Sequence, residues 1–376
     1  MTVVEQRERQ GKAPAFAPAD LDGAPRVDGL LRELGLGEFD RDTISSPPGR
    51  NQIWIGATTR VEKVFVKRLI GPEADVRARV DRMLSFQRFA EGVPAVAPHA
   101  PRMLGHDREA GLVVFEGITE AVSGAQLMVD EDFSEGLSRS IGRVLGSVHA
   151  AEPPEDAGIQ TSAPHFPSAE LLRALPMQMF DHLSFGELQA WGLMQGDPQV
   201  ASAVEDLLSA ERSAPQRPTH CDFRVDQVLA RPDGVLIADW EEFRLADAAR
   251  DVGGFAGEWL YRSVLDIVTT RGGLMAVEED LSHEDVLERG AQSLTRLRPY
   301  VHAFWQGYLE TRGPVDGDLR RRATAYAGWH LLDRLLAGSS RRARLSGIER
   351  AAAGIGRAAL LTPDRFAEAV GIEEAS

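Results

Sequence analysis

The chain has 376 residues, a formal net charge of −15 and 43% apolar residues. This length suits two lobes or domains rather than one small core, and the acidic balance argues against general binding to nucleic acid, whose phosphates need a basic surface. A single cysteine, Cys221, excludes an internal disulfide and fits a reducing compartment. No apolar run approaches the roughly 20 residues that span a bilayer, and the first residues lack the apolar core of a signal peptide. We therefore expect a cytoplasmic protein that does not contact a membrane.

The first part of the chain predicts a flexible segment followed by a small sheet. Residues 1–25 are rich in Ala, Pro and charge, as in mobile lead-in segments. The pattern then predicts a helix, two alternating strands, a second helix between Pro72 and Gly92, and an apolar strand. These elements fall at residues 27–39, 51–58, 63–69, 72–92 and 111–118. Residues 26–117 are thus expected to form a lobe with one helix against a sheet.

The remaining residues, 118–376, predict a larger and mostly helical lobe. Its exception is a hairpin around the turn RPDG, which leads into the apolar run VLIADW. Helical patterns are found at residues 135–153, 199–212, 283–311, 318–337 and 344–359. The combined expectation is an α+β fold with a small antiparallel sheet in one lobe and helices in the other.

The segment HCDFRVDQVLARPDGVLIADWEEF, residues 220–243, brings several chemical groups into a short stretch. Asp222 is a loop carboxylate that could take the proton of a substrate hydroxyl. Gln227 offers a neutral oxygen, and Asp239 follows the apolar VLIA run. Because Mg²⁺ is held by one or two protein carboxylates together with phosphates and water, this order of residues is typical of kinase-type phosphoryl transfer. The alternative is that these side chains only cap and stabilise turns.

This segment resembles the signature of the aminoglycoside phosphotransferase and choline kinase-like family, a branch of the protein-kinase-like fold. The family pattern is H-G-D-x-x-x-x-N, then I-D-W, then G-D-x-x-x-D-L. The chain matches it with His220, Asp222, Gln227, Asp239, Trp240, Asp247 and Asp251. It departs from it at Cys221, which replaces Gly, and at Gln227, which replaces Asn; the amide of Gln227 is one methylene longer and keeps the same ligand chemistry.

The resemblance implies a bilobal kinase-like fold that uses ATP and Mg²⁺. It makes Asp222 the catalytic base, gives the metal to Gln227 and Asp239, and lets His220 and Asp251 brace the loop, with His220 grouped among the catalytic residues. It also makes Lys67, in the apolar strand VFVKRL, the residue that contacts the nucleotide phosphates and pairs with an acid on the following helix.

The other positions carried over from the family lie mostly in the first lobe. Asp81 falls where the helix acid is expected, although Glu73 and Asp75 are nearer the start of the helix. Gly49 and Asn51 resemble a short G-x-x-N phosphate loop, which is equally consistent with an ordinary turn. Phe115 and Glu116 would form the hinge that reads the adenine edge. His149, at the end of a helix in the second lobe, is interpreted as structural.

The acceptor is the least defined part of the sequence. Trp329, His330 and Asp333 share one predicted helix, and the basic residues Arg341, Arg342 and Arg344 follow it. Core packing and a solvated face are the alternatives for these two groups, and an acidic peptide segment is the partner that the arginines would suit.

A closer resemblance concerns the combination of NQIWIG and VFVKRL with DWEEFRLADAARDVGGFAGEWL and AGWHLLDRLLAG. It is similar to the kinase subunits of class V lanthipeptide and thioamitide biosynthesis, which phosphorylate Ser and Thr of a precursor peptide before a partner lyase eliminates phosphate. A small-molecule kinase, such as an antibiotic phosphotransferase, is the alternative hypothesis. An inactive kinase-fold scaffold is a further one, and intact Lys67, Asp222 and Asp239 argue against it.

Overall fold

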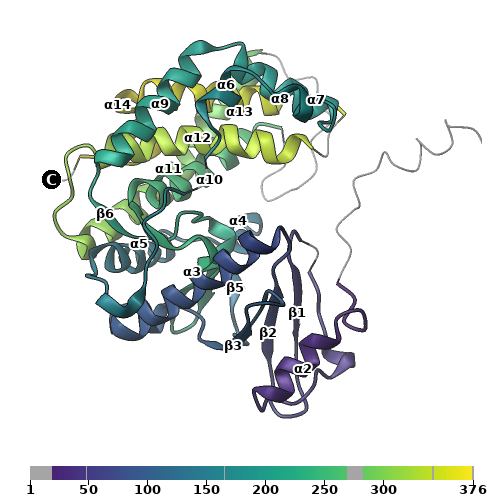
Figure 1. Cartoon of the computed structure of the whole chain (residues 1–376). Helices are drawn as coiled ribbons and strands as arrows, with labels where there is room; N and C mark the ends of the chain where they lie inside the picture. Colours follow the sequence, from purple (N-terminus) through teal and green to yellow (C-terminus); the bar gives the residue numbers. More distant parts are fainter. Residues whose placement is uncertain (1–18, 48, 165, 269–282, 341–342, 375–376) are drawn as a thin grey trace, which may run out of the picture.

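A computed structural model describes residues 19–47, 49–164, 166–268, 283–340 and 343–374. It has a small lobe built on an antiparallel sheet and a larger, mainly helical lobe, with helix α3 (Glu73–Gly92) beside the sheet (Figure 1). The predicted α+β, two-lobed architecture is confirmed. The predicted flexible segment is only partly within view, because residues 1–18 lie outside the described residues. From Ala19 onward the chain is packed rather than free, since Leu21 and Ala24 are buried.

The sheet of the small lobe has four strands in the order β1-β2-β4-β3, and all neighbours are antiparallel. The strands are β1 (Gln52–Gly56), β2 (Val64–Arg68), β3 (Met103–Asp107) and β4 (Leu112–Glu116). Strand β3 was not predicted, because its sequence MLGHD has no clear alternation. It pairs with β4 at the edge of the sheet, where a bulge interrupts the register between Met103 and Gly105.

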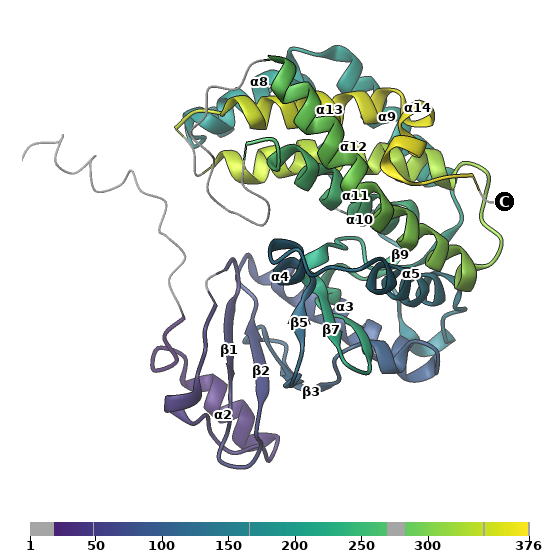
Figure 2. The same ribbon diagram turned by 180° about the vertical axis from the view of Figure 1, so that it is seen from behind.

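The two faces of this sheet have different roles. Alternation along β2 directs Val64 and Val66 to the outer face, where helix α2 (Pro25–Glu33) covers them (Figure 2). The buried cluster on the outer face is apolar and includes Trp54, which is fully buried. The inner face receives Val80 and Met83 of α3, and it also carries Lys67, whose charge makes this face the chemically active one.

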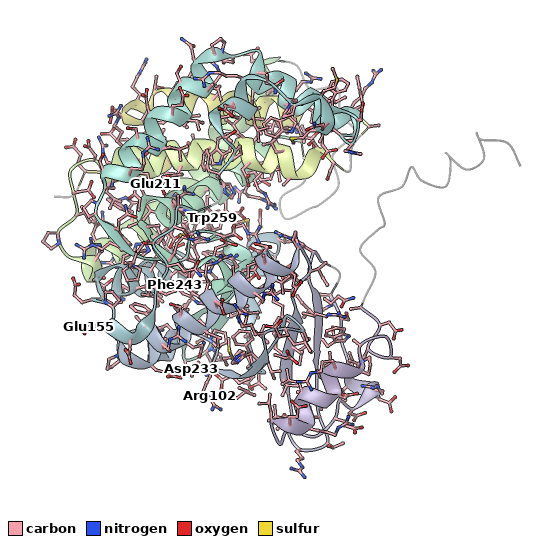
Figure 3. The ribbon with its side chains drawn as sticks, viewed as in Figure 1. Arg102, Glu155, Glu211, Asp233, Phe243 and Trp259 are labelled. Atoms are coloured by element: carbon pink, nitrogen blue, oxygen red, sulfur yellow. The ribbon has the colours of Figure 1, made fainter. Side chains whose placement is uncertain are left out.

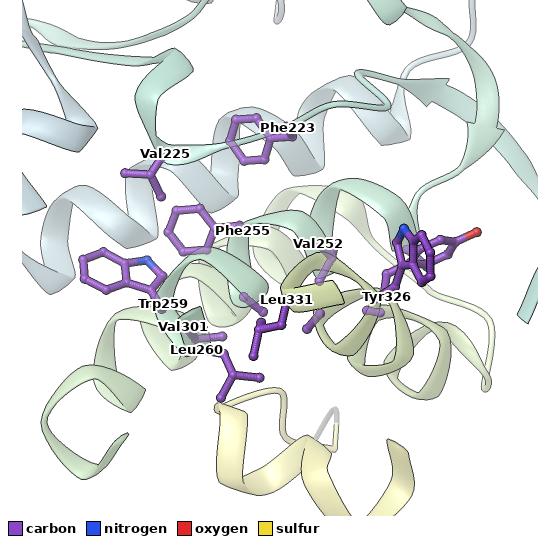
Figure 4. Packing of buried hydrophobic residues seen from close by; sticks show 14 of the residues in the cluster. Phe223, Val225, Val252, Phe255, Trp259, Leu260, Val301, Tyr326 and Leu331 are labelled. Carbon is purple, nitrogen blue, oxygen red and sulfur yellow. The ribbon is translucent and has the colours of Figure 1, made fainter. Parts of the chain in front are cut away.

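The larger lobe is an assembly of helices with two small sheets. Its helices are α4 (Gly124–Val129), α5 (Glu135–Ala150), α6 (Ala169–Arg173), α7 (Met177–Phe180), α8 (Phe185–Gln195), α9 (Pro198–Ser213), α10 (Ala249–Leu265), α11 (His283–Arg312), α12 (Leu319–Ser339), α13 (Gly347–Leu361) and α14 (Pro363–Val370). Helices α5 and α11 approach closely, because a Cβ at Gly142 would lie 2.0 Å from the carbonyl oxygen of Phe304. The core continues to the loop after β6, where the ring of Phe223 lies 6.2 Å from that of Phe255 on α10 (Figure 4).

The two small sheets hold the loops that matter for function. They are β5 (Val122–Ser123) with β7 (Val228–Arg231) and β8 (Gly234–Ile237), and β6 (Gln216–Thr219) with β9 (Arg244–Asp247). We call residues 220–227, between β6 and β7, the catalytic loop, and residues 238–243, between β8 and β9, the metal loop. Phe243 closes the metal loop in the interior, against Phe86 of α3 (Figure 3). Among the described helices, none is long and apolar enough to cross a membrane.

Candidate active site

A cavity of about 350 Å³ lies between the small lobe and the sheet β5-β7-β8. This volume is within the range of small-molecule sites. Its walls are mainly apolar and include Ile55, Phe65, Met83, Phe86, Phe115 and Leu229. Phe115 and Glu116 border it, as the hinge prediction requires, and Lys67 and Asp239 are among its charged residues. The cavity thus combines apolar walls that suit a base with a cation and a carboxylate that suit phosphates and a metal.

Lys67 is the buried cation of this cavity. Its Nζ donates to a carboxylate oxygen of Asp239 and lies 2.7 Å from Oε2 of Glu241. Burial lowers the pKa of Lys67, but the two carboxylates outweigh this and hold the pKa above its ordinary value, so the amine stays charged. Asp239 shows the reciprocal effect: burial raises its pKa, and Lys67 lowers it below the ordinary value. Sequence reasoning found Lys67 and Asp239 but missed Glu241.

The acid expected on the following helix is not the partner of Lys67, and the prediction of Asp81 for that role is wrong. Asp81 lies on another face of α3, where both of its carboxylate oxygens accept hydrogen bonds from Arg108 at 2.7 and 2.8 Å. Glu73 pairs instead with Arg77. Asp75 is 3.7 Å from Arg79.

The face of α3 that meets the metal loop is basic and aromatic. Arg79 donates to Oε1 of Glu241 at 2.6 Å, and Arg82 donates to the carbonyl oxygen of Glu241 at 2.6 Å. One turn further on, the ring of Phe86 stacks on Trp240 at 3.9 Å. Positions 79, 82 and 86 share one face of a helix. The spacing of the two arginines, against the acids of DWEEF, was a signal in the sequence that could have predicted this contact.

Asp222 occupies the catalytic loop with its side chain open to solvent. Surrounding protein raises the pKa of this carboxyl above its ordinary value, although nearby Arg224 and His220 act in the opposite direction. A raised pKa suits a group that must accept a proton during the reaction. Arg224 was missed by sequence reasoning. Burial lowers the pKa of its guanidinium, but the neighbouring acids Asp222 and Asp226 raise it overall, so a cation lies beside the candidate base.

Asp251, at the start of α10, fixes the backbone of the catalytic loop. Its two oxygens accept hydrogen bonds from the backbone N–H groups of His220 and Cys221 at 2.7 and 2.8 Å. His149 lies 3.1 Å from the same carboxylate and 3.1 Å from the hydroxyl of Tyr308. Asp251 and His149 are fully buried, so the bracing role of Asp251 and the structural interpretation of His149 agree with the geometry.

His220 joins the catalytic loop to the metal loop. Its Nε2 lies 3.0 Å from the carbonyl oxygen of Ala238, and the backbone N–H of Asp222 lies 3.4 Å from its Nδ1. The ring is fully buried and packs beside Trp240. The structure therefore makes His220 a positioning residue, and its grouping with the catalytic residues is corrected because the ring spans two loops rather than facing the cavity.

Two residues of these loops have left-handed backbone conformations. Cys221 has φ +68° and Asp239 has φ +68°, a region that costs residues other than glycine roughly 1–2 kcal/mol. At Cys221 the conformation is the one that the family glycine would adopt freely. At Asp239 it turns the carboxylate toward the cavity at the exit of β8. Burial raises the pKa of the Cys221 thiol well above its ordinary value, which leaves it protonated and unreactive.

The donors available for a metal are one carboxylate and one amide. The backbone N–H of Ala238 donates to the carbonyl oxygen of Gln227 at 2.9 Å, which brings Gln227 next to Asp239. The side-chain Oε1 of Gln227 accepts from the N–H of Arg224 at 2.8 Å, and its buried Nε2 has no hydrogen-bond partner. In the part of the chain that is described, no three His, Cys, Asp or Glu side chains form a metal-sized cluster. This sparse set fits Mg²⁺, which takes its other ligands from phosphates and water.

The predicted phosphate loop is placed differently. Gly49 and Asn51 do not border the cavity. The side-chain oxygen of Asn51 accepts from the N–H of Ile70 and from Arg79, both at 3.1 Å. The nucleotide contact expected of Asn51 is thus replaced by a brace between β1, the end of β2 and α3.

The residues considered for the acceptor do not form one site. Trp329 is core, packed at 4.4 Å against Phe166. His330 Nε2 donates to the carboxylate of Glu258 at 2.7 Å; burial raises the pKa of Glu258, but His330 outweighs it and lowers that pKa to about 2. Asp333 and Arg344 are exposed. Arg341 and Arg342 lie outside the described residues.

The phosphotransferase enzyme family has a model that matches residues 50–289 of the chain. A search of curated proteins found no match. The amicoumacin kinase hAmiN, solved with AMP-PNP, Ca²⁺ and Ami, aligns with a TM-score of 0.51 at 11% identity, over 89% of this chain and 93% of that one. The choline kinase LicA from Streptococcus pneumoniae, solved with AMP, aligns with a TM-score of 0.50 at 13% identity, over 90% and 98%.

These two structures share the fold of the chain, and the family match spans well over half of it, from the start of β1 through both functional loops. Lys67, Asp222 and Asp239 all fall inside the matched residues; Lys67 and Asp239 line the cavity, and Asp222 is close enough to Asp239 for the two charges to interact. The chain therefore belongs to the phosphotransferase enzyme family, and its activity is that of an ATP-dependent kinase with a hydroxyl group as acceptor.

Proposed function

We propose that this protein transfers the γ-phosphate of Mg-bound ATP to Ser or Thr hydroxyls of a ribosomally made, lanthipeptide-like precursor peptide. A partner lyase would then eliminate phosphate from the modified residues. The observation that carries the transfer step is the joint placement of Lys67 and Asp239 on the cavity with Asp222 on the adjacent loop. We place this activity in the cytoplasm. A single cysteine cannot form an internal disulfide, and this agrees with a reducing compartment.

Each residue has a definite task in this reaction. When bound, Mg²⁺ holds the phosphates and neutralises the negative charge that develops on them. Asp239 supplies a carboxylate to the metal, and the amide oxygen of Gln227 has a second lone pair to offer it. Lys67 presents its cation to the phosphates. Asp222 orients the acceptor hydroxyl and takes its proton as the oxygen attacks. Arg224 keeps positive charge beside Asp222.

Support for a peptide acceptor comes from the surface of the larger lobe as well as from the sequence resemblance. Met177 and Phe180 on α7 and Phe185 on α8 are exposed, Met177 by 78% and Phe185 by 57%. Neighbouring exposed apolar side chains are typical of surfaces that bind another chain. In this proposal a peptide would contact this surface as well as the catalytic loop.

A small-molecule acceptor is the second candidate. Glu258 keeps a negative charge at neutral pH, and its carboxylate is close enough to Arg224 for the two charges to influence each other. An ionised carboxylate in that position would suit a cationic acceptor. The similar structures of an amicoumacin kinase and a choline kinase act on small molecules by their names, which favours this candidate on grounds of fold alone.

The deciding experiment offers a Ser/Thr-rich precursor peptide and an aminoglycoside mixture together with Mg-ATP, and mass spectrometry reads the phosphate. We expect phosphate on the peptide, and none with Asp222→Asn. Phosphate on the aminoglycoside alone would overturn the peptide proposal. No transfer to either acceptor, with ATP still bound, would make a partner chain or another acceptor the next test, and only silence with every partner would favour an inactive scaffold.

A further inference from the structure

We infer that Glu241 is the permanent acid partner of Lys67, and that Arg79 of α3 positions this pair from the other side. Asp239 would then be the exchangeable partner, which Lys67 gives up when a metal binds. In this arrangement the helix contributes a cation and the metal loop contributes the acid. The charges are thereby reversed from the lysine and helix-acid pair that the sequence led us to expect at Asp81.

The two carboxylates around Lys67 differ in their surroundings. The side chain of Asp239 is 31% exposed and borders the cavity, so it can accept another ligand. The side chain of Glu241 is only 12% exposed and does not border the cavity. Oε1 of Glu241 accepts a hydrogen bond from Arg79 at 2.6 Å, and Oε2 forms an ion pair with Lys67 at 2.7 Å without a hydrogen bond. To reach a metal, Glu241 would have to give up its contacts with two buried cations, whereas Asp239 contacts only Lys67 and would leave that amine with Glu241 still in place.

Arg79 ties this acid to the rest of the small lobe. Its side chain is 1% exposed. Besides Glu241, Arg79 donates to the side-chain oxygen of Asn51 at 3.1 Å and to the carbonyl oxygen of Ile70 at 3.3 Å. These contacts connect the start of β1, the end of β2 and α3 to the metal loop. A planar guanidinium with several donors suits such a junction, because it holds its partners at fixed angles.

Charge balance explains why Glu241 is required. Lys67 and Arg79 are two buried cations, and Glu241 is the carboxylate that contacts both, while Asp239 also pairs with Lys67 and Asp75 lies 3.7 Å from Arg79. If Glu241 lost its charge, Lys67 would depend on Asp239 alone, and a metal would have to compete with the amine for that carboxylate. Removing this acid is therefore expected to weaken metal-dependent nucleotide binding as well as the placement of the Lys67 amine.

The test compares Glu241→Gln with Asp81→Asn, which removes the acid that sequence reasoning favoured but the structure pairs with Arg108. Calorimetric titration with ATP and Mg²⁺ is the first readout, because it needs no acceptor. We expect Glu241→Gln to weaken Mg-ATP binding about 10- to 100-fold, the usual range for residues that orient metal ligands. Asp81→Asn should bind within twofold of the wild type. Equal binding by Glu241→Gln and the wild type, or a weaker Asp81→Asn, would overturn the inference.

Further variants separate positioning from general damage. Arg79→Gln should weaken binding in the same direction, and its combination with Glu241→Gln should add little, because the two side chains act as one unit. With an accepted substrate, KM for ATP should rise and kcat should fall while KM for the acceptor stays constant. Glu241→Asp keeps the charge and should recover part of the affinity, which provides a folded variant if Glu241→Gln is unstable.

This inference rests on the kinase activity and on no particular acceptor. If the peptide were not phosphorylated but Glu241→Gln still lost Mg-ATP affinity, the acceptor proposal would fail and the role of Glu241 would stand. If the losses of Mg-ATP affinity were additive in the double variant, the proposed role of Arg79 would be contradicted, but the role of Glu241 would not.

Discussion

The two carboxylates that organise this site, Asp251 and Glu241, are held in different ways. Asp251 is fully buried and accepts from His149 and from two backbone N–H groups of the loop; those N–H groups cannot leave without unfolding the loop. Glu241 is held by the side-chain cations Lys67 and Arg79, and Lys67 can change partners by rotating its own bonds. The difference teaches that the candidate base Asp222 lies on a loop fixed by backbone hydrogen bonds, while the proposed metal side is held by side-chain ion pairs, which can exchange partners.

The largest effect is expected at the atom that the rigid loop carries. Asp222→Asn keeps the shape of the side chain but removes its ability to take a proton, so kcat should fall by about 10²- to 10⁴-fold. Binding of Mg-ATP, measured by calorimetry, should remain close to that of the wild type. Retained turnover would show that Asp222 is not the base, and lost nucleotide binding would show that this loop is less rigid than the comparison requires.

Breaking the rigid side itself should cost stability rather than affinity. Asp251→Ala leaves the N–H groups of His220 and Cys221 buried without acceptors, which should lower the free energy of unfolding by about 3–5 kcal/mol in chemical denaturation. Asp333→Ala, an exposed site on α12, is the control and should stay within about 0.5 kcal/mol. A small loss of unfolding free energy for Asp251→Ala would mean that Asp251 fixes its loop no more firmly than Lys67 and Arg79 hold Glu241.

The pH dependence of transfer sharpens the view of Asp222. Because the surroundings raise its pKa above the ordinary 3.8, the base becomes protonated, and the rate falls, as the pH drops through a value higher than that of a free carboxyl group. Below it, kcat should decrease about tenfold per pH unit. Arg224 lowers this pKa, so Arg224→Met should move the acid limb to higher pH. A shift to lower pH would contradict the placement of that cation.

The smallest effect concerns the strained residue of the rigid loop. Cys221→Gly should raise the free energy of unfolding by about 1 kcal/mol or less, since glycine adopts φ +68° freely but gains freedom in the unfolded chain. Cys221→Ala removes the thiol and keeps the strained conformation, so thermal unfolding should show no gain for it. Equal melting temperatures for Cys221→Gly and Cys221→Ala would show that any change comes from losing the packing of the thiol and not from relief of the backbone strain.

Much of the fold and the reacting residues could be predicted from the sequence. Strand alternation and helix patterns identified the main elements of both lobes, and Asp222 and Asp239 were found because each lies in a contiguous motif that survives in one chain. Lys67 was found for a related reason, since a lysine inside an apolar strand is unusual enough to suggest a role. Strand β3, the short helices α6 and α7, and the longer helices α8 and α10 were not predicted.

The remaining parts depend on which face of an element meets which loop. Asp81 and Arg79 are only two positions apart, yet a helix turns them to different sides. The family pattern predicted that position 81 faces the site, whereas the structure places Arg79 on that side. Asn51 fits a phosphate loop in the sequence, while its side chain is occupied within the lobe. The roles of Trp329 and His330 could not be separated from the sequence. Adjacent positions on a helix do not show which side chain packs in the core against Phe166 and which one pairs with Glu258.

The stacking of Phe86 on Trp240 has a consequence for compounds that might block this protein. Both rings border the cavity, and they join α3 to the metal loop at 3.9 Å with nearly parallel planes. An inhibitor that needs this helix to swing outward would have to separate two buried aromatic faces and the arginine contacts beside them. Compounds that fill the cavity as it stands face no such barrier, and shape complementarity to a fixed wall is the sensible criterion for selecting them.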